Sequence, residues 1–339
     1  MTKDEQHITS SKTILVVGGA GYIGSHMVKM LLEHDYEVVT LDNLSGGYRD
    51  AVIGGEFEYV DLANKPELER VFKKYQFDAV MHFASYIQVG ESVINPAMYY
   101  ENNVVNTLNL LDVMVKFDVK SFVFSSTAAI FGEPEYTPID EKHPKNPINP
   151  YGRSKLIIEE ILKDYDKAYN LKSICLRYFN AAGADPEGLL GERHEPETHL
   201  IPLILQAASG RRKSISVFGR DYNTPDGTCI RDYIHIVDLC AAHLLSLEKL
   251  IKEKNSCAYN LGNGNGFSVQ KVIEVAKEVT GKDISIVGDT RREGDPAILL
   301  ADAILAKTEL GWCPQYSELS IIIECSWRWE LKLQQTIKQ

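Results

Sequence analysis

The sequence predicts an α/β fold: a Rossmann-type, doubly wound parallel sheet followed by a smaller C-terminal α/β domain. Two observations lead to this prediction. In the first half of the chain, short apolar runs rich in β-branched residues alternate with longer segments whose apolar residues recur at helical spacing. The short runs are almost continuously apolar, which is typical of parallel strands that helices cover on both faces.

The elements follow in order along the first half. We expect strands at residues 13–17, 37–41, 57–60, 78–83, 121–125 and 173–178. Helices are expected between them, at residues 22–34, 66–75, 97–117 and 150–169. Because a helix separates most successive strands, the strands should pair in parallel through right-handed crossovers.

The pattern changes after Asn180. Residues 181–197 are rich in Gly, Pro and acidic side chains, which predicts a loop. Shorter elements follow, with helices expected at 200–208, 237–250 and 269–280 and strands at 215–218 and 284–287. We therefore expect a first domain at residues 12–180 and a second at 181–339, with residues near 229–240 as a segment that could return to the first.

Composition narrows the classes of function. The chain has 36 Lys and Arg against 47 Asp and Glu, a net charge of −11, which argues against a surface that coats nucleic acid. It has no apolar run of the roughly 18 residues that a membrane span needs. The polar start, residues 1–11, does not resemble a signal peptide.

Cysteine and histidine usage gives two further expectations. The six cysteines show no C-x-x-C spacing, so we interpret them as buried thiols of a reducing, cytoplasmic compartment. Neither an H-E-x-x-H motif nor a Cys/His cluster is present, so no metal site is expected.

A glycine-rich turn joins the first strand to the first helix. Gly18, Gly21 and Gly24 follow the pattern G-x-x-G-x-x-G. Such glycines let the backbone approach a pyrophosphate, and the helix N-terminus presents unpaired N–H groups to it. Asp42 ends the second strand, 18 residues after Gly24. A carboxylate there accepts a hydrogen bond from a ribose 2′-hydroxyl and repels a 2′-phosphate, which predicts NAD rather than NADP.

Polar residues also end the following strands. Asp61 follows the third strand, where adenine could meet a carboxylate, and Phe83-Ala84-Ser85 ends the fourth. Because the carboxyl ends of parallel strands share one edge of the sheet, we expect all these residues to face one crevice.

A second group of residues carries acid–base chemistry. Tyr151 and Lys155 stand four positions apart at the start of a helix and share one face, while Ser125-Ser126-Thr127 ends the fifth strand. The pKa of a free tyrosine, near 10, makes it a poor base, but a nearby ammonium and a nicotinamide cation would favour the phenolate. The hydroxyl of Thr127 or Ser126 could bridge Tyr151 to a substrate alcohol, so that proton transfer accompanies hydride transfer.

Together these motifs resemble the extended short-chain dehydrogenase/reductases, and the second half of the chain narrows the resemblance to the UDP-glucose 4-epimerase family. The stretches that carry it are GGAGYIGSH (18–26), LDNLSGG (41–47), MHFAS (81–85), VGES (89–92), FSSTAAIFG (124–132), NPYGRSK (149–155), RYFNAAGA (177–184), DYNTPDGTCIRDYIHIVDL (221–239), YNLGNGNGFSV (259–269) and RREGDPA (291–297).

The resemblance implies an enzyme that interconverts UDP-glucose and UDP-galactose. NAD takes the C4 hydride of the sugar, the 4-keto intermediate turns over, and the hydride returns to its opposite face. Tyr151 would be the base, Lys155 would hold the nicotinamide ribose, and Thr127 would bond the sugar 4-oxygen. A homodimer is also implied, with residues 97–117 and 150–169 as candidate interface helices.

The resemblance also implies the residues that contact each ligand. The candidate NAD contacts are Gly18, Gly21, Tyr22, Ile23, Gly24, Asp42, Asn43, Asp61, Leu62, Phe83, Ala84, Ser85, Asn102, Ser125, Tyr151, Lys155, Tyr178 and Phe179. The candidate substrate contacts are Thr127, Tyr151, Asn180, His199, Leu200, Ser216, Phe218, Arg231, Tyr233, Arg292, Asp295 and Leu299. Arg231 and Arg292 would neutralise the phosphates, and Leu299 would stand beside the sugar 2-substituent.

Two departures from the family pattern and three alternative functions stay open. Ile87 stands where relatives often have lysine, which removes a contact to the cofactor diphosphate, and Thr198-His199 replaces a common Asn-Asn pair. A 4,6-dehydratase would carry Asp-Glu where this chain has Ala128-Ala129. Leu299 leaves activity on UDP-N-acetylglucosamine undecided, and a non-catalytic dinucleotide sensor would not need Thr127, Tyr151 and Lys155 together.

Overall fold

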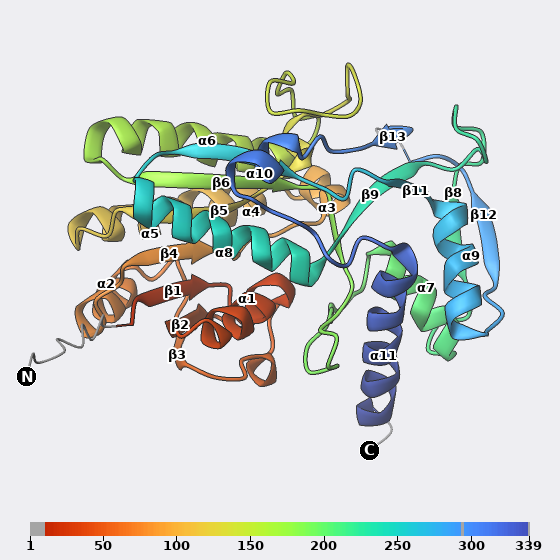
Figure 1. Ribbon diagram of the computed structural model, residues 1–339, viewed down its shortest axis with the longest axis horizontal. Helices are drawn as coiled ribbons and strands as arrows, with labels where there is room; N and C mark the ends of the chain where they lie inside the picture. The colour runs from red at the N-terminus through yellow and green to blue at the C-terminus, as the bar shows by residue number, and fades with distance from the viewer. Residues whose placement is uncertain (1–10, 293–294, 338–339) are drawn as a thin grey trace, which may run out of the picture.

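A seven-stranded parallel sheet forms the larger lobe of the computed structural model (Figure 1), which describes residues 11–292 and 295–337. Its spatial order is β10-β6-β5-β4-β1-β2-β3. The strands are β1 (Thr13–Val17), β2 (Glu37–Asp42), β3 (Glu56–Tyr59), β4 (Ala79–His82), β5 (Ser121–Thr127), β6 (Lys172–Tyr178) and β10 (Cys257–Leu261). All neighbouring pairs are parallel, which confirms the predicted doubly wound fold. Residues 1–10, the expected polar lead-in, and Gly294 lie outside the described residues.

Helices cover both faces of this sheet, which explains the continuous apolar strands. On one face, α1 (Tyr22–Glu33) and α8 (Ile236–Glu253) pack against the alternate residues Ile14 and Val16 of β1. The opposite face of β1 packs in the core that includes α2 (Lys65–Lys74), α5 (Asn106–Lys116) and α6 (Pro150–Tyr169). Successive residues of a strand point to opposite faces, so each strand is apolar at nearly every position.

The helix expected at residues 97–117 is interrupted. It consists of α4 (Pro96–Tyr100), a π-helical turn at Glu101–Val105 and then α5, and a short helix α3 (Val89–Ile94) precedes it. The turn places Asn103 against Ser154 of α6, with 3.1 Å between Asn103 Nδ2 and Ser154 Oγ. Such π turns are frequent at functional sites, and this one carries the candidate cofactor residue Asn102.

The smaller lobe is built around a second sheet. Strands β7 (Asn180–Ala182), β9 (Ile230–His235), β11 (Gly266–Ser268) and β13 (Ile298–Leu299) form it, and β8 (Ile215–Phe218) pairs separately with β12 (Ile286–Asp289). Helices α7 (Leu200–Ser209), α9 (Val269–Thr280) and α11 (Leu319–Ile337) share an apolar core with these strands, while α10 (Ile304–Glu309) contacts β10. In Figure 1 this lobe stands beside the carboxyl edge of the large sheet.

The second half differs in detail from its prediction. Residues 181 and 182, expected at the start of a loop, belong to β7 together with Asn180, and the strand expected at 284–287 begins at Ile286. The strand-like segment 229–237 is β9 of the second sheet, whereas α8 packs on α1 and β10 extends the first sheet. The helix α11 was not predicted. A domain division near residue 180 stays a proposal, and the chain returns to the first lobe after it.

The cysteines are free thiols, as their spacing predicted. Cys175, Cys229, Cys240 and Cys325 are buried, and Cys257 is half-buried. Cys313 is exposed, so the expectation that all six are buried is wrong at this position. It lies in the loop after α10, where neither lobe covers it.

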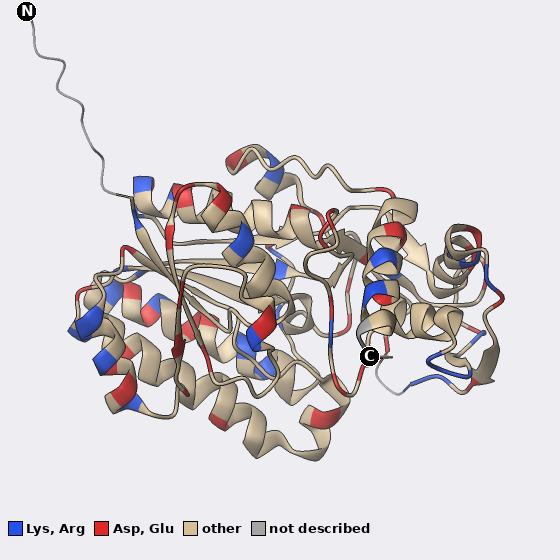
Figure 2. Ribbon diagram, turned by 90° about the horizontal axis from the view of Figure 1, so that it is seen from below, with Lys and Arg blue, Asp and Glu red and all other residues tan. Residues whose placement is uncertain are grey.

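The surface carries interspersed charges of both signs. Figure 2 shows acidic and basic residues along the helices of both lobes. Many of them form ion pairs with neighbours. Lys65 Nζ lies 2.8 Å from Asp112 Oδ2, and Lys163 Nζ lies 2.7 Å from Glu160 Oε1. Within residues 11–292 and 295–337, no helix combines the length and the hydropathy that crossing a bilayer requires.

One ion pair is fully buried between α6 and the sheet. Arg177 of β6 donates to both carboxylate oxygens of Glu159, with Nε–Oε1 and Nη2–Oε2 distances of 2.9 and 2.7 Å. Ser126 of β5 also donates to Glu159, at 2.6 Å. Both charged residues are at most 4% exposed. This contact therefore fixes α6 against the ends of β5 and β6, and removing one partner would leave an uncompensated buried charge.

We predict that Glu159→Gln lowers the free energy of unfolding by about 3 kcal/mol or more, because Arg177 then keeps its charge without a counterion. Glu160→Gln is the matched control: Glu160 is the next residue of α6, and its side chain and that of Lys163 are each 57% exposed. It should cost less than about 1 kcal/mol. Denaturant unfolding followed by circular dichroism compares the two. Equal denaturant midpoints for Glu159→Gln and Glu160→Gln would contradict the claim that the buried ion pair stabilises the fold.

Candidate active site

The glycine turn leaves an open space in front of α1. Gly18 has a φ of +77°, and a Cβ there would lie 2.5 Å from the backbone nitrogen of Ala84. A Cβ on Gly24 would lie 2.1 Å from the carbonyl oxygen of Gly18. Packing therefore requires both glycines. A Cβ on Gly21 would approach only one atom, at 3.4 Å, so the missing side chain there leaves room beside the N-terminus of α1. This cradle fits a pyrophosphate.

Asp42 ties the glycine turn to the end of β2. One carboxylate oxygen accepts a hydrogen bond from Ala20 N at 3.0 Å, and the other accepts one from Leu44 N at 2.7 Å. Burial raises the pKa of Asp42, and the two hydrogen bonds oppose this shift. At the next strand end, Asn43 Nδ2 donates to Asp61 Oδ2 at 2.7 Å. The predicted polar row therefore lies along one edge of the sheet, where the adenine and its ribose would lie in a bound dinucleotide.

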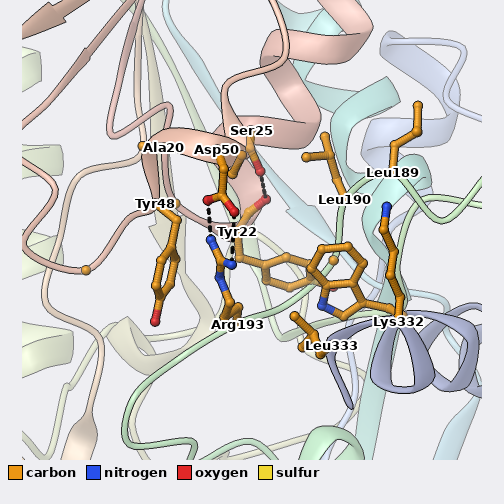
Figure 3. Close-up of a pocket in the computed structure, with 15 residues that line it drawn as sticks. Ala20, Tyr22, Ser25, Tyr48, Asp50, Leu189, Leu190, Arg193, Lys332 and Leu333 are labelled. Atoms are coloured by element: carbon orange, nitrogen blue, oxygen red, sulfur yellow. Dashed lines mark hydrogen bonds and ion pairs between the residues drawn. The ribbon is translucent and has the colours of Figure 1, made fainter. Parts of the chain in front are cut away.

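A cavity of about 170 Å³ opens beside the turn (Figure 3). Arg193, from the loop before α7, points to Asp50 in the loop after β2, and the two form an ion pair. Its guanidinium carbon lies 3.5 Å from the ring centroid of Tyr48. These residues were not among the predicted site residues. The L-D-N-L-S-G-G motif precedes Tyr48 and Asp50 in sequence, but no local pattern points to Arg193.

The start of α6 places Tyr151 and Lys155. Asn149 caps the helix by accepting a hydrogen bond from Gly152 N at 2.8 Å, and Pro150 occupies the first turn. Lys155, one turn later, is 3% exposed, and its Nζ donates to the carbonyl oxygen of Ser125 at 2.9 Å. Burial lowers the pKa of Lys155 to about 7. The helix thus carries its ammonium group to the end of β5.

Tyr151 lies beside Thr127, at the end of β5, and the Thr127 side chain acts to lower its pKa. Burial raises the pKa of Tyr151, and the effect of Thr127 only partly offsets this. We expected Lys155 and a nicotinamide cation to lower the pKa of Tyr151. In the protein without cofactor, burial raises it instead. Of the two hydroxyls proposed as the bridge, Ser126 is engaged with buried Glu159. Thr127 is therefore the hydroxyl that contacts Tyr151.

The ends of β4, β5 and β6 meet at one place. The ring centroids of Tyr178 and His243 of α8 are 6.1 Å apart, and Ser125 Oγ lies 3.2 Å from His243 Nε2. The ring centroids of His243 and Phe83 are 5.0 Å apart. Three predicted cofactor residues from three strands therefore share a neighbour in His243, which was not predicted.

The candidate substrate residues come from the smaller lobe and from its junction with the large sheet. Arg231 is 9% exposed and forms an ion pair with Asp295. The guanidinium carbon of Arg292 lies 3.9 Å from the ring centroid of Phe218, and Ser216 is exposed on the same strand. Leu299 packs against the small buried cluster of Ile130, Phe131 and Ile139, and Phe179 and Ala128 pack against the same cluster. Asn180 of β7 is in register with buried Tyr233 of β9.

Asp232 organises the loops around Arg231 and was not predicted. It is fully buried, and its carboxylate accepts hydrogen bonds from Asn263 N at 2.6 Å, Gly264 N at 3.2 Å and Ala301 N at 3.1 Å. Burial raises its pKa to about 6. The buried carboxylate thus holds the residues after β10 and β13 to β9, which carries Arg231 and Tyr233.

His199 and Leu200 lie where α7 begins. His199 Nδ1 contacts buried Glu192, so one ring nitrogen of this candidate diphosphate ligand is already engaged. His194 lies 3.2 Å from the same carboxylate oxygen. The carboxylates of Glu192 and Glu197 raise the pKa of His194 to about 10 against the effect of burial. The loop before α7 therefore contains a charged cluster that the sequence did not reveal.

The chain is similar to known proteins over most of its length. Residues 14–262 match the model of the NAD dependent epimerase/dehydratase family. The chain is 52% identical over 316 residues to a UDP-glucose 4-epimerase of Halalkalibacterium halodurans, covering 93% of this chain and 95% of the relative.

Solved structures are similar over nearly the whole chain. The UDP-glucose 4-epimerase of Brucella ovis in complex with NAD has a TM-score of 0.92 and 47% identity over 94% of this chain and 98% of that one. The UDP-Glc/GlcNAc 4-epimerase of Campylobacter jejuni has a TM-score of 0.83 and 44% identity over 95% of this chain and 100% of that one. The chain belongs to the NAD dependent epimerase/dehydratase family and, within it, to the UDP-glucose 4-epimerases.

Proposed function

We propose that the chain interconverts UDP-glucose and UDP-galactose, with Tyr151 as the residue that takes and returns the proton of the sugar 4-hydroxyl. The observation that carries this proposal is the position of Tyr151 beside Thr127, with Lys155 one helical turn away. All three lie at the carboxyl edge of the sheet, beside the glycine turn. A non-catalytic dinucleotide sensor would have no use for this arrangement.

The residues that would hold the cofactor are those of the glycine turn and of the strand ends. The open space at Gly21 fits the pyrophosphate, and Asp42 fits a ribose without a 2′-phosphate. Lys155 would bond the nicotinamide ribose, with Tyr178 and Phe179 beside the ring. When bound, NAD supplies the acceptor and donor of the C4 hydride. Ile87 is 40% exposed and offers no charge to the diphosphate.

The substrate would lie between the two lobes. Arg231 and Arg292 would neutralise its two phosphates, and the ring of Phe218, over which Arg292 lies, would face the uracil. Asp295 holds Arg231 in place through their ion pair. The two cations compensate the charge of the diphosphate, which leaves the sugar to be positioned by Thr127, Tyr151 and Leu299.

Proton transfer follows from the contacts of Tyr151. Thr127 would bond the sugar 4-oxygen while the phenolate of Tyr151 takes the proton from the same oxygen. Burial disfavours this phenolate, so a positive charge must stabilise it. Lys155 supplies one in its protonated form, since it lies on the same helix face. After the sugar turns over, Tyr151 returns the proton to the 4-oxygen.

We predict that Tyr151→Phe lowers kcat by about 10²–10⁴-fold, because a positioned acid–base group is lost. Its bound NAD should be retained, since the ring remains in place. Tyr169→Phe is the matched control on the same helix, where Tyr169 is 47% exposed. Steady-state kinetics and the nucleotide content of each purified variant decide the matter. Turnover of Tyr151→Phe near that of the wild type would refute the proton-transfer role.

The size of the accepted sugar is a separate proposal that concerns Leu299. This side chain packs against the buried cluster of Ile130, Phe131 and Ile139, as Phe179 and Ala128 also do, and we infer that its volume borders the space in which the sugar must turn over. We expect UDP-glucose and UDP-galactose as the main pair, and little activity on UDP-N-acetylglucosamine. The dehydratase alternative is disfavoured because Ala128 and Ala129 follow Thr127, and alanine supplies no acid or base.

We predict that Leu299→Ala raises kcat/KM for UDP-N-acetylglucosamine relative to UDP-glucose by about 10-fold or more, since a few methylenes are worth about 1–3 kcal/mol. Leu300→Ala is the control, because Leu300 is adjacent in sequence and packs against Gly266 of β11 instead. An unchanged ratio in Leu299→Ala would refute the gate. Equal kcat/KM for the two substrates in the wild type would refute the preference.

A homodimer through the helices near residues 97–117 and 150–169 is also proposed. Val105 is 51% exposed in the π-helical turn, and Val93 and Ile94 of the preceding α3 are 61% and 79% exposed. These exposed apolar side chains support the proposal, since exposed apolar surface is often an interaction site. Light scattering at micromolar concentration should give twice the mass of one chain, and the mass of one chain would contradict the dimer.

We further propose that the protein acts in the cytoplasm. Its six free cysteines, all within the described residues, support a reducing compartment. Fractionation of the source cells tests this, and recovery from an oxidising compartment would contradict it.

A further inference from the structure

Two histidines and two glutamates converge in the loop between β7 and α7. Glu192, His194, Glu197 and His199 each place one nitrogen or oxygen atom within 4.8 Å of the other three. The spacing E-x-H-x-x-E-x-H matches no common metal motif, which is why the sequence predicted no metal site. The fold brings the four donors together because the loop turns back before α7 begins.

The donors face a common point. His194 Nδ1 lies 3.2 Å from Glu192 Oε1, and His199 Nδ1 contacts the same oxygen. His194 Nδ1 also lies 3.7 Å from Glu197 Oε2. The two imidazole rings are nearly perpendicular, at 88°, with centroids 5.4 Å apart. The two rings therefore reach Glu192 in different planes.

The carboxylates are buried and held in place. The side chains of Glu192 and Glu197 are each 5% exposed. Glu197 Oε1 accepts hydrogen bonds from the backbone nitrogens of Thr198 at 2.7 Å and His199 at 2.8 Å, which leaves Oε2 to face His194. Trp329 of α11 donates to the carbonyl oxygen of Glu192 at 2.9 Å. The hydrogen bonds to Glu197 fix its orientation, as outer hydrogen bonds do for metal ligands.

We propose that Glu192, His194, Glu197 and His199 bind one zinc ion in a four-coordinate site. Two imidazole nitrogens and two carboxylate oxygens are a donor set for zinc, whereas calcium and magnesium take oxygen ligands. The two carboxylates balance the double charge of the ion. Four protein donors leave no open position for a substrate, so the role of the ion is structural.

A zinc ion at this site would stabilise the contact between the loop before α7 and the start of α1, next to the glycine turn. The ring of His194 is nearly perpendicular to that of Tyr22, the first residue of α1, with centroids 6.4 Å apart. Arg193, between two of the ligands, forms the ion pair with Asp50 across the cavity (Figure 3). A metal ion that orders this loop would therefore keep His194 beside Tyr22 and Arg193 paired with Asp50.

The test is metal binding by the purified protein with its nucleotide bound. After treatment with a chelator, Zn²⁺ is titrated in competition with a chromophoric chelator, and a second sample is loaded with Co²⁺. We expect one ion per chain and the intense visible absorption of tetrahedral Co²⁺. His194→Ala and His199→Asn should weaken Zn²⁺ binding by about 10–100-fold or more, because even loss of an outer partner costs that much. Glu195→Gln, in the same loop and exposed, should bind as the wild type does.

Three results would overturn the site. These are fewer than half an ion bound per chain, a weak octahedral Co²⁺ spectrum, and equal Zn²⁺ affinity in His199→Asn and Glu195→Gln. The Co²⁺ spectrum is measured on the wild type, so it decides the matter even if the histidine variants do not fold. Epimerase activity is not the readout, so a failure here leaves the proposed reaction standing.

Discussion

All seven strands of the large sheet run in the same direction, and the site depends on this constraint. The loop after each strand leaves from the same edge of the sheet. Residues far apart in sequence therefore meet at that edge as a consequence of the topology. The glycine turn follows β1, Asp42 ends β2, and Thr127 ends β5. The smaller lobe, whose sheet begins directly after β6, covers this edge and brings Arg231 toward it.

Helix α6 adds the reactive side chains to that edge at a cost in stability. Burial lowers the pKa of Lys155 and raises that of Tyr151, so both charged forms are disfavoured in the protein alone. The buried pair of Arg177 and Glu159 holds the same helix against β5 and β6. This buried ion pair, one turn beyond Lys155, thus holds in place the helix that carries Tyr151 and Lys155, whose charged forms burial disfavours. Active sites commonly need such support from neighbouring contacts.

Much of this was predictable from the sequence, because local patterns suffice for regular elements. The apolar period located β1, β8, α6 and α9 with the observed limits, and the G-x-x-G-x-x-G turn located the cofactor cradle. The strand β10 was missed because its sequence, Cys-Ala-Tyr-Asn-Leu, is short and has no β-branched residue. The side-chain partners of Tyr151 depend on packing, so the sequence left Thr127 and Ser126 equivalent.

Long-range contacts of the second half were beyond local patterns. The pairing of Arg193 with Asp50 joins residues 143 positions apart, and the convergence of Glu192 and His199 depends on how one loop turns. Asp232 is an acid within a strand, and only the three backbone nitrogens around it show why it is buried. Such residues act through tertiary structure, and no spacing rule identifies them.

The central claim is that one chain with a resident NAD transfers the hydride away and back within the same site. The most direct measurement is incubation of the purified protein with UDP-galactose and no added cofactor, followed by chromatography of the nucleotide sugars. We expect many turnovers per chain, ending in an equilibrium mixture of UDP-glucose and UDP-galactose. A single turnover, or conversion only in proportion to added NAD, would contradict the account.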